Sequence, residues 1–165
     1  METPTFDQVM ELPTLVEAVV QPDFIDINGH MNVRHYLELN ADGTTVVCER
    51  VGIDDDYRAK RRMGVFTAEH HIRYYSELHL GEELSVHPVV LDRNDKVVHM
   101  MVYLLDRTHR RLSNTLELML VHVDLDTRRT VPMPAEIADG FDRFIAEREA
   151  LPWKAPVCGV MGVRR

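Results

Sequence analysis

The chain has 165 residues, 45% of them hydrophobic, so its length predicts one domain with one substantial core. A formal net charge of −8 argues against non-specific binding to nucleic acid or to an acidic membrane surface, both of which need a basic protein face. Only two cysteines occur, and no signal peptide or apolar run of about 20 residues is visible, so we expect no disulfide framework, no membrane span and a cytoplasmic location.

The N-terminal third is expected to hold one strand and one long helix. Residues 1–13 look like a short lead-in, and residues 14–20 read as a strand that ends before Pro22. Residues 33–51 have the spacing of an amphipathic helix, with Asn32 as its N-cap and Gly52 as its C-terminal stop.

Gly43 lies in the middle of the stripe that this helix is expected to bury. The stripe consists of Tyr36, Asn40, Gly43, Val47 and Arg50. A glycine inside a helix costs about 1 kcal/mol relative to alanine, so its presence needs a structural reason. We therefore expect the helix to approach a sheet very closely at Gly43.

The rest of the chain changes to the period of β-strands. Strands are predicted over residues 65–75, 83–92, 96–106 and 112–124, separated by turns at 77–81, 93–95 and 107–111. Short connections between consecutive strands indicate antiparallel hairpins. An amphipathic helix is predicted over residues 135–149, followed by an irregular tail over residues 151–165.

These elements predict one α+β domain, residues 1–165, in which an antiparallel sheet wraps around the long helix. The strand over residues 116–124 is apolar on both faces, so the sheet face away from the helix needs a cover. We expect a second subunit to cover that face and the open edges of the sheet, which predicts a homodimer or a homotetramer.

Residues 26–32, with the sequence DINGHMN, hold the strongest functional signal. They place Asp26, His30 and the carboxamides of Asn28 and Asn32 directly before a helix start, where the N–H groups near Val33 are natural donors to an oxyanion. A carboxylate can act there as nucleophile or general base on a carbonyl compound. Alternatively, Asp26 forms an Asx turn and His30 orients the loop, but this clustering favours chemistry at a carbonyl.

Glu69 and Glu117 are further candidate carboxylates, because each lies inside an otherwise apolar strand. Strict alternation would place Thr67, Glu69 and His71 on one side of the sheet, and Glu117 on a side with apolar residues. A carboxylate on an apolar face needs partners or a raised pKa, so both are candidates for a general base or for positioning water. The alternative is a salt bridge across a dimer interface.

The nine histidines do not have the spacing of a metal site. His70 and His71 are adjacent on a strand and should point to opposite faces, and the chain has neither a His-Glu-x-x-His motif nor a paired-cysteine motif. We expect no metal and no cofactor. The basic turn that contains Arg107 and Arg110 is either a solvated turn or a docking site for an anionic group such as a nucleotide phosphate.

Several segments together resemble a known family, the hotdog-fold acyl-CoA thioesterases of the 4-hydroxybenzoyl-CoA thioesterase type. The family pattern of Asp, then Gly-His-x-Asn, then a helical Tyr is matched by Asp26, Gly29, His30, Asn32 and Tyr36. The segments IDINGHMN (25–32), FTAEH (66–70), ELMLVHVD (117–124) and ALPW (150–153) resemble the betainyl-CoA thioesterases of carnitine catabolism. This likeness extends over nearly the whole chain.

The resemblance implies a hotdog fold and hydrolysis of a small acyl-CoA. Betainyl-CoA is one substrate that it suggests. It implies that Asp26 attacks the thioester carbonyl or activates water, with the Val33 amide in the oxyanion hole. The site would lie between two subunits, so Glu69 or Glu117 would serve the partner's substrate, and surface Arg or Lys residues would hold the CoA phosphates. Phe24, Tyr36, Phe66, Tyr74 and Tyr75 are the aromatic residues available to a quaternary ammonium group.

Two other functions stay open from the sequence. A hotdog hydratase or dehydratase that acts on 3-hydroxyacyl thioesters usually has Asp-x-Asn-Pro-x-His, whereas this chain has a four-residue step from Asp26 to His30 without a proline. A non-catalytic acyl-CoA-binding module would keep the fold without the chemistry. The presence of Asp26, His30 and Asn32 together favours an enzyme.

Overall fold

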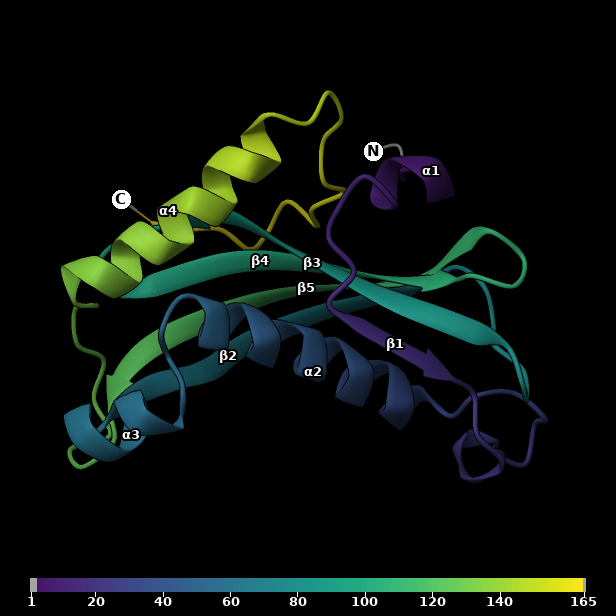
Figure 1. Ribbon diagram of the computed structural model, residues 1–165, viewed down its shortest axis with the longest axis horizontal. Coiled ribbons are helices and arrows are strands. Elements are labelled where there is room, and N and C mark those ends of the chain that lie inside the picture. Colours follow the sequence, from purple (N-terminus) through teal and green to yellow (C-terminus); the bar gives the residue numbers. More distant parts are fainter. Residues whose placement is uncertain (1–2, 165) are drawn as a thin grey trace.

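The computed structural model describes residues 3–164 and shows a curved five-stranded antiparallel sheet around one long helix (Figure 1). The strands lie in the order β1-β3-β4-β5-β2. They are β1 (Val16–Val19), β2 (Met63–Tyr74), β3 (Glu83–Arg93), β4 (Val97–Asp106) and β5 (Arg111–Asp124). The helices are α1 (Phe6–Val9), the 3-10 turn η1 (Pro22–Phe24), α2 (Val33–Arg50), α3 (Asp55–Arg61) and α4 (Ala135–Glu149). The predicted α+β arrangement is confirmed, and the predicted strands and long helices agree with the structure to within two residues at each end.

Helix α2 begins and ends where its capping residues predict. Asn32 caps its first turn, and Gly52 follows its last turn with φ of +101°. The expected burial of Arg50 is wrong, because the helical period of 3.6 residues carries the buried stripe from Val47 to Val51 and leaves Arg50 in solvent.

Gly43 brings α2 into close contact with the sheet, as predicted. A Cβ atom at this position would lie 2.8 Å from Val86 Cγ1 and 3.1 Å from Pro88 Cγ, both on β3. Any larger side chain would therefore push the helix away from the strand. The glycine is conformationally unfavourable within the helix but permits the packing that seats α2 in the curved sheet.

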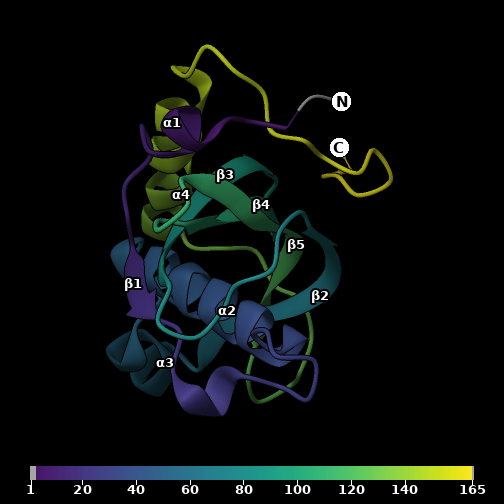
Figure 2. The same ribbon diagram turned by 90° about the vertical axis from the view of Figure 1, so that its right-hand side faces the viewer.

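The other face of the sheet is covered by the chain itself. Helix α1 and the tail after α4 lie over that face (Figure 2), and Trp153 packs edge to face on Tyr103 with ring centroids 5.7 Å apart. Phe6 and Val9 of α1 join this second core. The expectation that a second subunit covers this face is therefore wrong over β3, β4 and β5, because the lead-in and the tail bury these strands.

Strand β2 forms an open edge of the sheet. It pairs with β5 on one side only, and residues 66–70 are exposed. The register shifts between Thr67 and Glu69, so Ala68 is the extra residue of a β-bulge. An open strand edge has unpaired backbone groups that another strand can join.

Two short helices were not predicted. Asp54 caps α3 by accepting the Tyr57 N–H at 2.8 Å, and Thr5 and Gln8 form a capping box around α1. Both helices are too short to show a hydrophobic period, so only their capping residues mark them in the sequence. Across residues 3–164, no helix is long and apolar enough to cross a bilayer.

Candidate active site

The loop before α2 is a tight turn closed by backbone hydrogen bonds. Ile25 and Met31 form an isolated antiparallel bridge, and the Asp26 N–H donates to the His30 carbonyl at 3.1 Å. The Gly29 N–H donates to the Asp26 carbonyl at 3.0 Å, and Gly29 has φ of +83°, a conformation that favours glycine. The loop therefore holds Asp26 directly across from His30.

The Asp26 carboxylate is half-buried and has one hydrogen bond within this loop. Its Oδ1 atom accepts the Asn28 N–H at 2.8 Å, which is the Asx turn considered as the alternative role of Asp26. That bond leaves Oδ2 without a bonded donor among residues 3–164. The structural and the catalytic roles of Asp26 are thus compatible, because one oxygen holds the loop and the other stays available.

The start of α2 presents a free amide beside this loop. The Asn32 side chain accepts the Arg34 N–H at 3.1 Å, and the Asn32 N–H donates to the Phe24 carbonyl at 2.9 Å. The Val33 N–H, in contrast, has no acceptor within the described residues, and Val33 is exposed. A free amide at a helix N-terminus can donate to a developing oxyanion.

A pocket of about 290 Å³ opens at this helix start. It is lined by His30, Met31, Val33, Tyr36, Tyr74, Tyr75, Ser76 and Glu77. Its wall is tied to the loop, since the Met31 N–H donates to the Leu78 carbonyl at 2.7 Å and the Leu78 N–H donates to the Tyr36 hydroxyl at 3.1 Å. Burial raises the pKa of Tyr36, so its hydroxyl stays neutral, and its ring meets Tyr74 edge to face at 5.2 Å.

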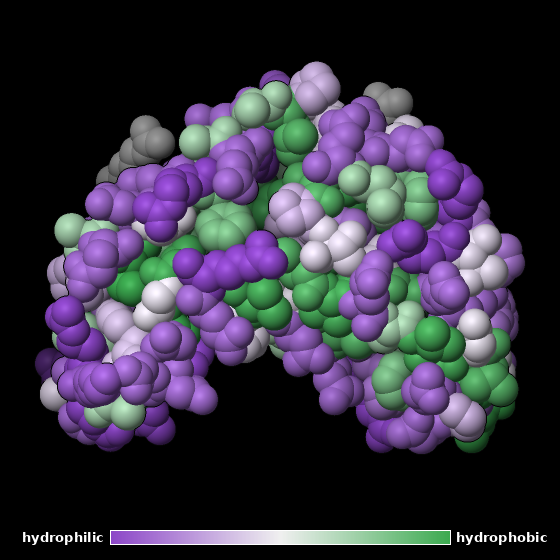
Figure 3. All heavy atoms as spheres, in the orientation of Figure 1, coloured by the Kyte–Doolittle hydropathy of each residue, from purple (hydrophilic) through white to green (hydrophobic). Residues whose placement is uncertain are grey.

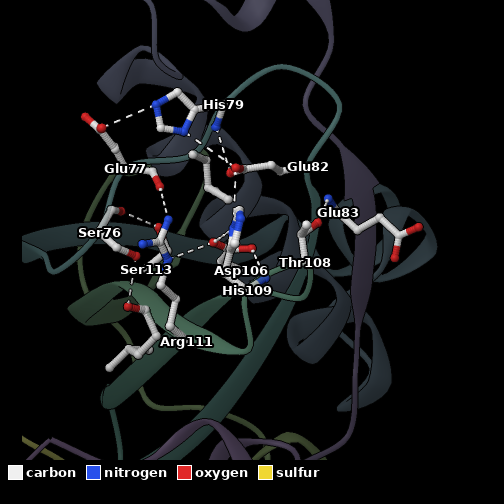
Figure 4. Close-up of polar contacts among 12 residues, drawn as sticks. Ser76, Glu77, His79, Glu82, Glu83, Asp106, Thr108, His109, Arg111 and Ser113 are labelled. Carbon is white, nitrogen blue, oxygen red and sulfur yellow. Dashed lines mark hydrogen bonds and ion pairs between the residues drawn. The ribbon is translucent and has the colours of Figure 1, made fainter.

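The segment after β2 is fastened to the β4–β5 hairpin by a polar network (Figure 4). The Ser113 hydroxyl donates to the Ser76 carbonyl at 2.6 Å, and Arg111 donates both to the Glu77 carbonyl at 3.2 Å and to Asp106 at 2.8 Å. Burial alone would raise the pKa of Asp106, but hydrogen bonds from His109 and Arg111 lower it overall. The network fixes the wall of the pocket to the sheet.

A second, apolar groove of about 360 Å³ runs along α2. It lies between α2 and strands β2 and β5 and is lined by Leu37, Ala41, Thr44, Thr45, Cys48, Arg58, Val65, Thr67, His70, Leu116, Leu118 and Leu120. Leu37 is one helical turn from Val33, so the groove continues the exposed stripe that starts at the pocket. Figure 3 shows that the molecule is hollowed below α2, between α3 and the loop that follows β1.

The model of one protein family, described as the thioesterase-like superfamily, matches residues 20–141. The chain belongs to this thioesterase-like superfamily. An L-carnitine dehydrogenase/betainyl-CoA thioesterase of Agrobacterium fabrum is 35% identical over 135 residues, which make up 82% of this chain and 28% of that relative. A betainyl-CoA thioesterase of Pseudomonas aeruginosa is 29% identical over 91% of this chain and 94% of its own length. The thioesterase-like chain thus spans under a third of the first relative and nearly all of the second.

Solved structures of low sequence identity share the fold. A hypothetical protein from Staphylococcus aureus, in complex with CoA, has a TM-score of 0.81 at 22% identity over 93% of this chain and 97% of its own. A 1,4-dihydroxy-2-naphthoyl-CoA thioesterase from Synechocystis has a TM-score of 0.68 at 12% identity over 77% of this chain and 93% of its own. The hotdog fold implied by the sequence resemblance is confirmed.

Most of the predicted loop residues of this thioesterase-like chain come together at the helix start. His30, Val33, Tyr36 and Tyr74 line the pocket, and Asp26 lies across the turn from His30. The His30 Nδ1 atom is 3.3 Å from the Met31 carbonyl. Asn28 and Asn32 act through the Asx turn and the helix cap, so the structure gives them positioning contacts.

Two of the predicted aromatic residues lie apart from this pocket. Phe24 stacks on His35 with ring centroids 4.1 Å apart, which supports the helix start from outside the pocket. Phe66 alternates with Val65 and Thr67, which line the groove, so it faces the side of the sheet away from α2, where Arg128 lies 5.2 Å from its ring centroid. The prediction that Phe66 contacts the substrate is therefore wrong for the pocket of its own chain.

The carboxylates Glu69 and Glu117 also lie on the side of the sheet away from α2. The bulge at Ala68 reverses the alternation, so Thr67 lines the groove while Glu69 and His71 face the other side. Their expected grouping with Thr67 is therefore wrong. Glu117 is buried beneath the tail and is bonded to His99, so within one chain neither carboxylate reaches the α2 pocket.

The two predicted phosphate ligands have partners elsewhere. Arg107 pairs with Glu17 at 3.2 Å, and Arg110 pairs with Asp7 and lies 4.5 Å from the ring centroid of Phe6. Neither contacts the loop of Asp26 or lines its pocket. Sequence reasoning missed His70 and Leu37 as groove residues, although the apolar spacing Val33, Leu37, Ala41 marks the exposed stripe of α2.

Proposed function

We propose that this chain is an acyl-CoA thioesterase that hydrolyses a small acyl-CoA to the free acid and CoA. One observation carries the proposal: a closed turn holds the Asp26 carboxylate across from His30, and His30 lines the same pocket as Val33, whose amide is unbonded. Attack on a thioester needs a carboxylate that acts as nucleophile or base, and an N–H group that donates to the carbonyl oxygen as it becomes negative. Homologues named thioesterases support the proposal.

In the proposed reaction the thioester carbonyl oxygen accepts the Val33 N–H while the carbonyl carbon is attacked. Asp26 either removes a proton from the attacking water or attacks directly and forms a mixed anhydride that water then hydrolyses. In both routes the carbon–sulfur bond breaks, the sulfur leaves as the CoA thiol after protonation, and the acyl group leaves as a carboxylic acid. The positive end of the α2 dipole stabilises the oxyanion further.

We propose a small acyl group that carries a quaternary ammonium, as in betainyl-CoA. Tyr36, Tyr74 and Tyr75 give the pocket three aromatic rings, and Glu77 adds a carboxylate on the same wall. A cation over an aromatic face gains about 0.5–2 kcal/mol per ring. The names of the relatives support the same acyl group.

We propose that the working form is a cytoplasmic homodimer, or a homotetramer built from such dimers. The open edge of β2 lies beside the apolar groove, so a second copy that pairs along β2 would also cover Leu37 and His70. The pocket at the start of α2 is open to solvent, and the partner would close it. In such an assembly Glu69 would lie at the joined edge, on the face of the sheet away from α2.

The test is a panel of acyl-CoA substrates with the release of free thiol as the signal. We expect betainyl-CoA to be hydrolysed with a higher kcat/KM than uncharged chains of equal length. Preference for long uncharged chains would contradict the acyl group, and calorimetric binding without thiol release would contradict the enzyme. Bleaching of a crotonyl thioester without thiol release would instead favour the hydratase.

A further inference from the structure

Three metal-ligating side chains meet on the side of the sheet away from α2. His71 lies on β2, Glu117 on β5 and Cys158 in the tail, and a nitrogen, a carboxylate oxygen and the sulfur all lie within 4.8 Å of one another. Glu117 is 1% exposed, whereas His71 and Cys158 are half-buried. Glu117 thus forms the buried part of the cluster, and solvent reaches it past His71 and Cys158.

The backbone and a second histidine hold these groups in place. His71 is the direct register partner of Glu117, with Nδ1 3.9 Å from Oε2, and the bulge at Ala68 sets this facing. The Cys158 N–H donates to Glu117 Oε2 at 2.6 Å, which fixes the tail over the strand. His99 lies 2.8 Å from the other oxygen of Glu117, Oε1. Hydrogen bonds of this kind orient a ligating carboxylate.

We propose that His71, Glu117 and Cys158 bind one divalent transition metal ion of the zinc class, which fastens the tail to the edge strand. Imidazole nitrogen, carboxylate oxygen and thiolate sulfur are the three ligand types of zinc sites, and three protein ligands leave the fourth tetrahedral position for water. A divalent ion with one carboxylate and one thiolate has no net charge. The ion therefore neutralises a carboxylate that is otherwise buried without an arginine or lysine partner among the described residues.

A second cluster of ligand-type residues shows why the first one is the stronger candidate. Glu82, Asp106 and His109 also have ligand atoms within 4.8 Å of one another. Asp106, however, is already bonded to Arg111 and to His109, so its charge has a cation beside it. The Glu117 cluster has no arginine or lysine ion pair among the described residues.

The proposed ion would stabilise the tail rather than take part in thioester chemistry. The tail carries Trp153, which packs on Tyr103 in the second core, and Cys158 lies a few residues farther along. A metal bond at Cys158 therefore secures the cover of that core. The pocket at the start of α2 lies on the opposite side of the sheet, so metal binding and hydrolysis are separable measurements.

The test uses the full chain treated with a chelator and then titrated with Co²⁺ and with Zn²⁺. We expect one equivalent of Co²⁺ to produce a thiolate-to-cobalt charge-transfer band, which Cys158→Ser abolishes. Cys48 lines the groove on the α2 side of the sheet, on the opposite face from the cluster, so the band must survive Cys48→Ser. Because the Cys158 thiol loses its proton when it binds the metal as a thiolate, Zn²⁺ affinity should increase with pH.

Adjacent histidines give a matched control. His71→Gln should weaken Zn²⁺ binding more than about tenfold, while His70→Gln, on the groove side of the same strand, should leave it unchanged. Zn²⁺ should also raise the thermal midpoint of the wild type but not of Cys158→Ser. The proposal is overturned if the wild type binds no Zn²⁺ at one equivalent, if the cobalt band persists in Cys158→Ser, or if both histidine variants bind alike.

Discussion

The Leu78 N–H donates to the Tyr36 hydroxyl at 3.1 Å, and the Leu78 carbonyl accepts the Met31 N–H at 2.7 Å. Leu78 thus joins the first turn of α2 to the loop of Asp26. Because Leu78 is fully buried, these two bonds have no solvent substitute. The position of the candidate catalytic loop depends on a residue that touches no substrate.

Tyr36→Phe removes the acceptor of the buried Leu78 N–H. We expect a loss of about 1–3 kcal/mol in the free energy of unfolding, because an unpaired buried amide retains its desolvation penalty. Tyr74→Phe is the control, since Tyr74 is exposed and its hydroxyl has no bond to residues 3–164. Urea unfolding measures both variants, and equal stability of the two would contradict the role of Tyr36.

Gly43→Ala tests the close approach of α2 to β3. The added methyl group would lie 2.8 Å from Val86 Cγ1, so the helix or the strand must move. We expect a net loss of about 1–3 kcal/mol despite a gain of about 1 kcal/mol in helix propensity. Glu49→Ala, at an exposed position of the same helix outside the groove, should be neutral or stabilising. If Gly43→Ala were as stable as wild type in urea, the packing of α2 on β3 would have room for a methyl group, which would contradict the close approach.

Gly43 and Ala68 show what the sequence can and cannot predict about this fold. A glycine in a buried helical stripe has one physical reason, close packing, and the structure has that packing. The bulge at Ala68 adds one residue to β2 and turns every later side chain to the other face, which no period of two can reveal. The faces of Glu69 and His71 were therefore not predictable.

The functional residues also divide into those that the sequence predicts and those that it does not. Asp26, His30 and Val33 are neighbours in the sequence, so one loop and one helix start suffice to predict that His30 and Val33 line one pocket with Asp26 across the turn. His71, Glu117 and Cys158 come from three distant segments and meet only after the tail folds back over the sheet. Linear metal motifs cannot detect such a group. Arg107 and Arg110 looked available for phosphate because the sequence does not show their partners Glu17 and Asp7.

Asp106 should give the chain an acid-sensitive stability. Its pKa in the folded state lies below the usual aspartate value of 3.8, so its ionised form stabilises the fold above about pH 4, and this contribution is lost as the pH falls through the folded pKa. Asp106→Asn should therefore be less stable at neutral pH and should lose less stability than wild type on acidification. Glu83→Gln, an exposed carboxylate nearby, is the control for urea unfolding at each pH. Parallel pH curves for wild type and Asp106→Asn would refute this.

Leu37→Glu tests the proposed assembly. Leu37 is 40% exposed on the apolar groove, and a charge there would be buried by a second copy that covers the groove. We expect the dimer dissociation constant to increase more than about tenfold. Leu80→Glu places the same charge at a leucine that is 58% exposed and lies outside the groove, so it should leave the dimer intact. Analytical ultracentrifugation measures both, and a wild type that is monomeric at micromolar concentration would end the dimer proposal.

The most direct measurement is the release of free thiol from betainyl-CoA by Asp26→Asn, with Asp23→Asn as the control. Asparagine keeps the Oδ1 acceptor for the Asn28 N–H, so the loop should hold its shape and the unfolding midpoint should stay near that of wild type. We expect kcat to decrease by at least about a hundredfold, the usual loss when an acid–base group is removed. Asp23 is an exposed carboxylate close by in the sequence, and its variant should retain wild-type rates. Undiminished hydrolysis by a folded Asp26→Asn protein would contradict the assignment of Asp26 as the catalytic carboxylate.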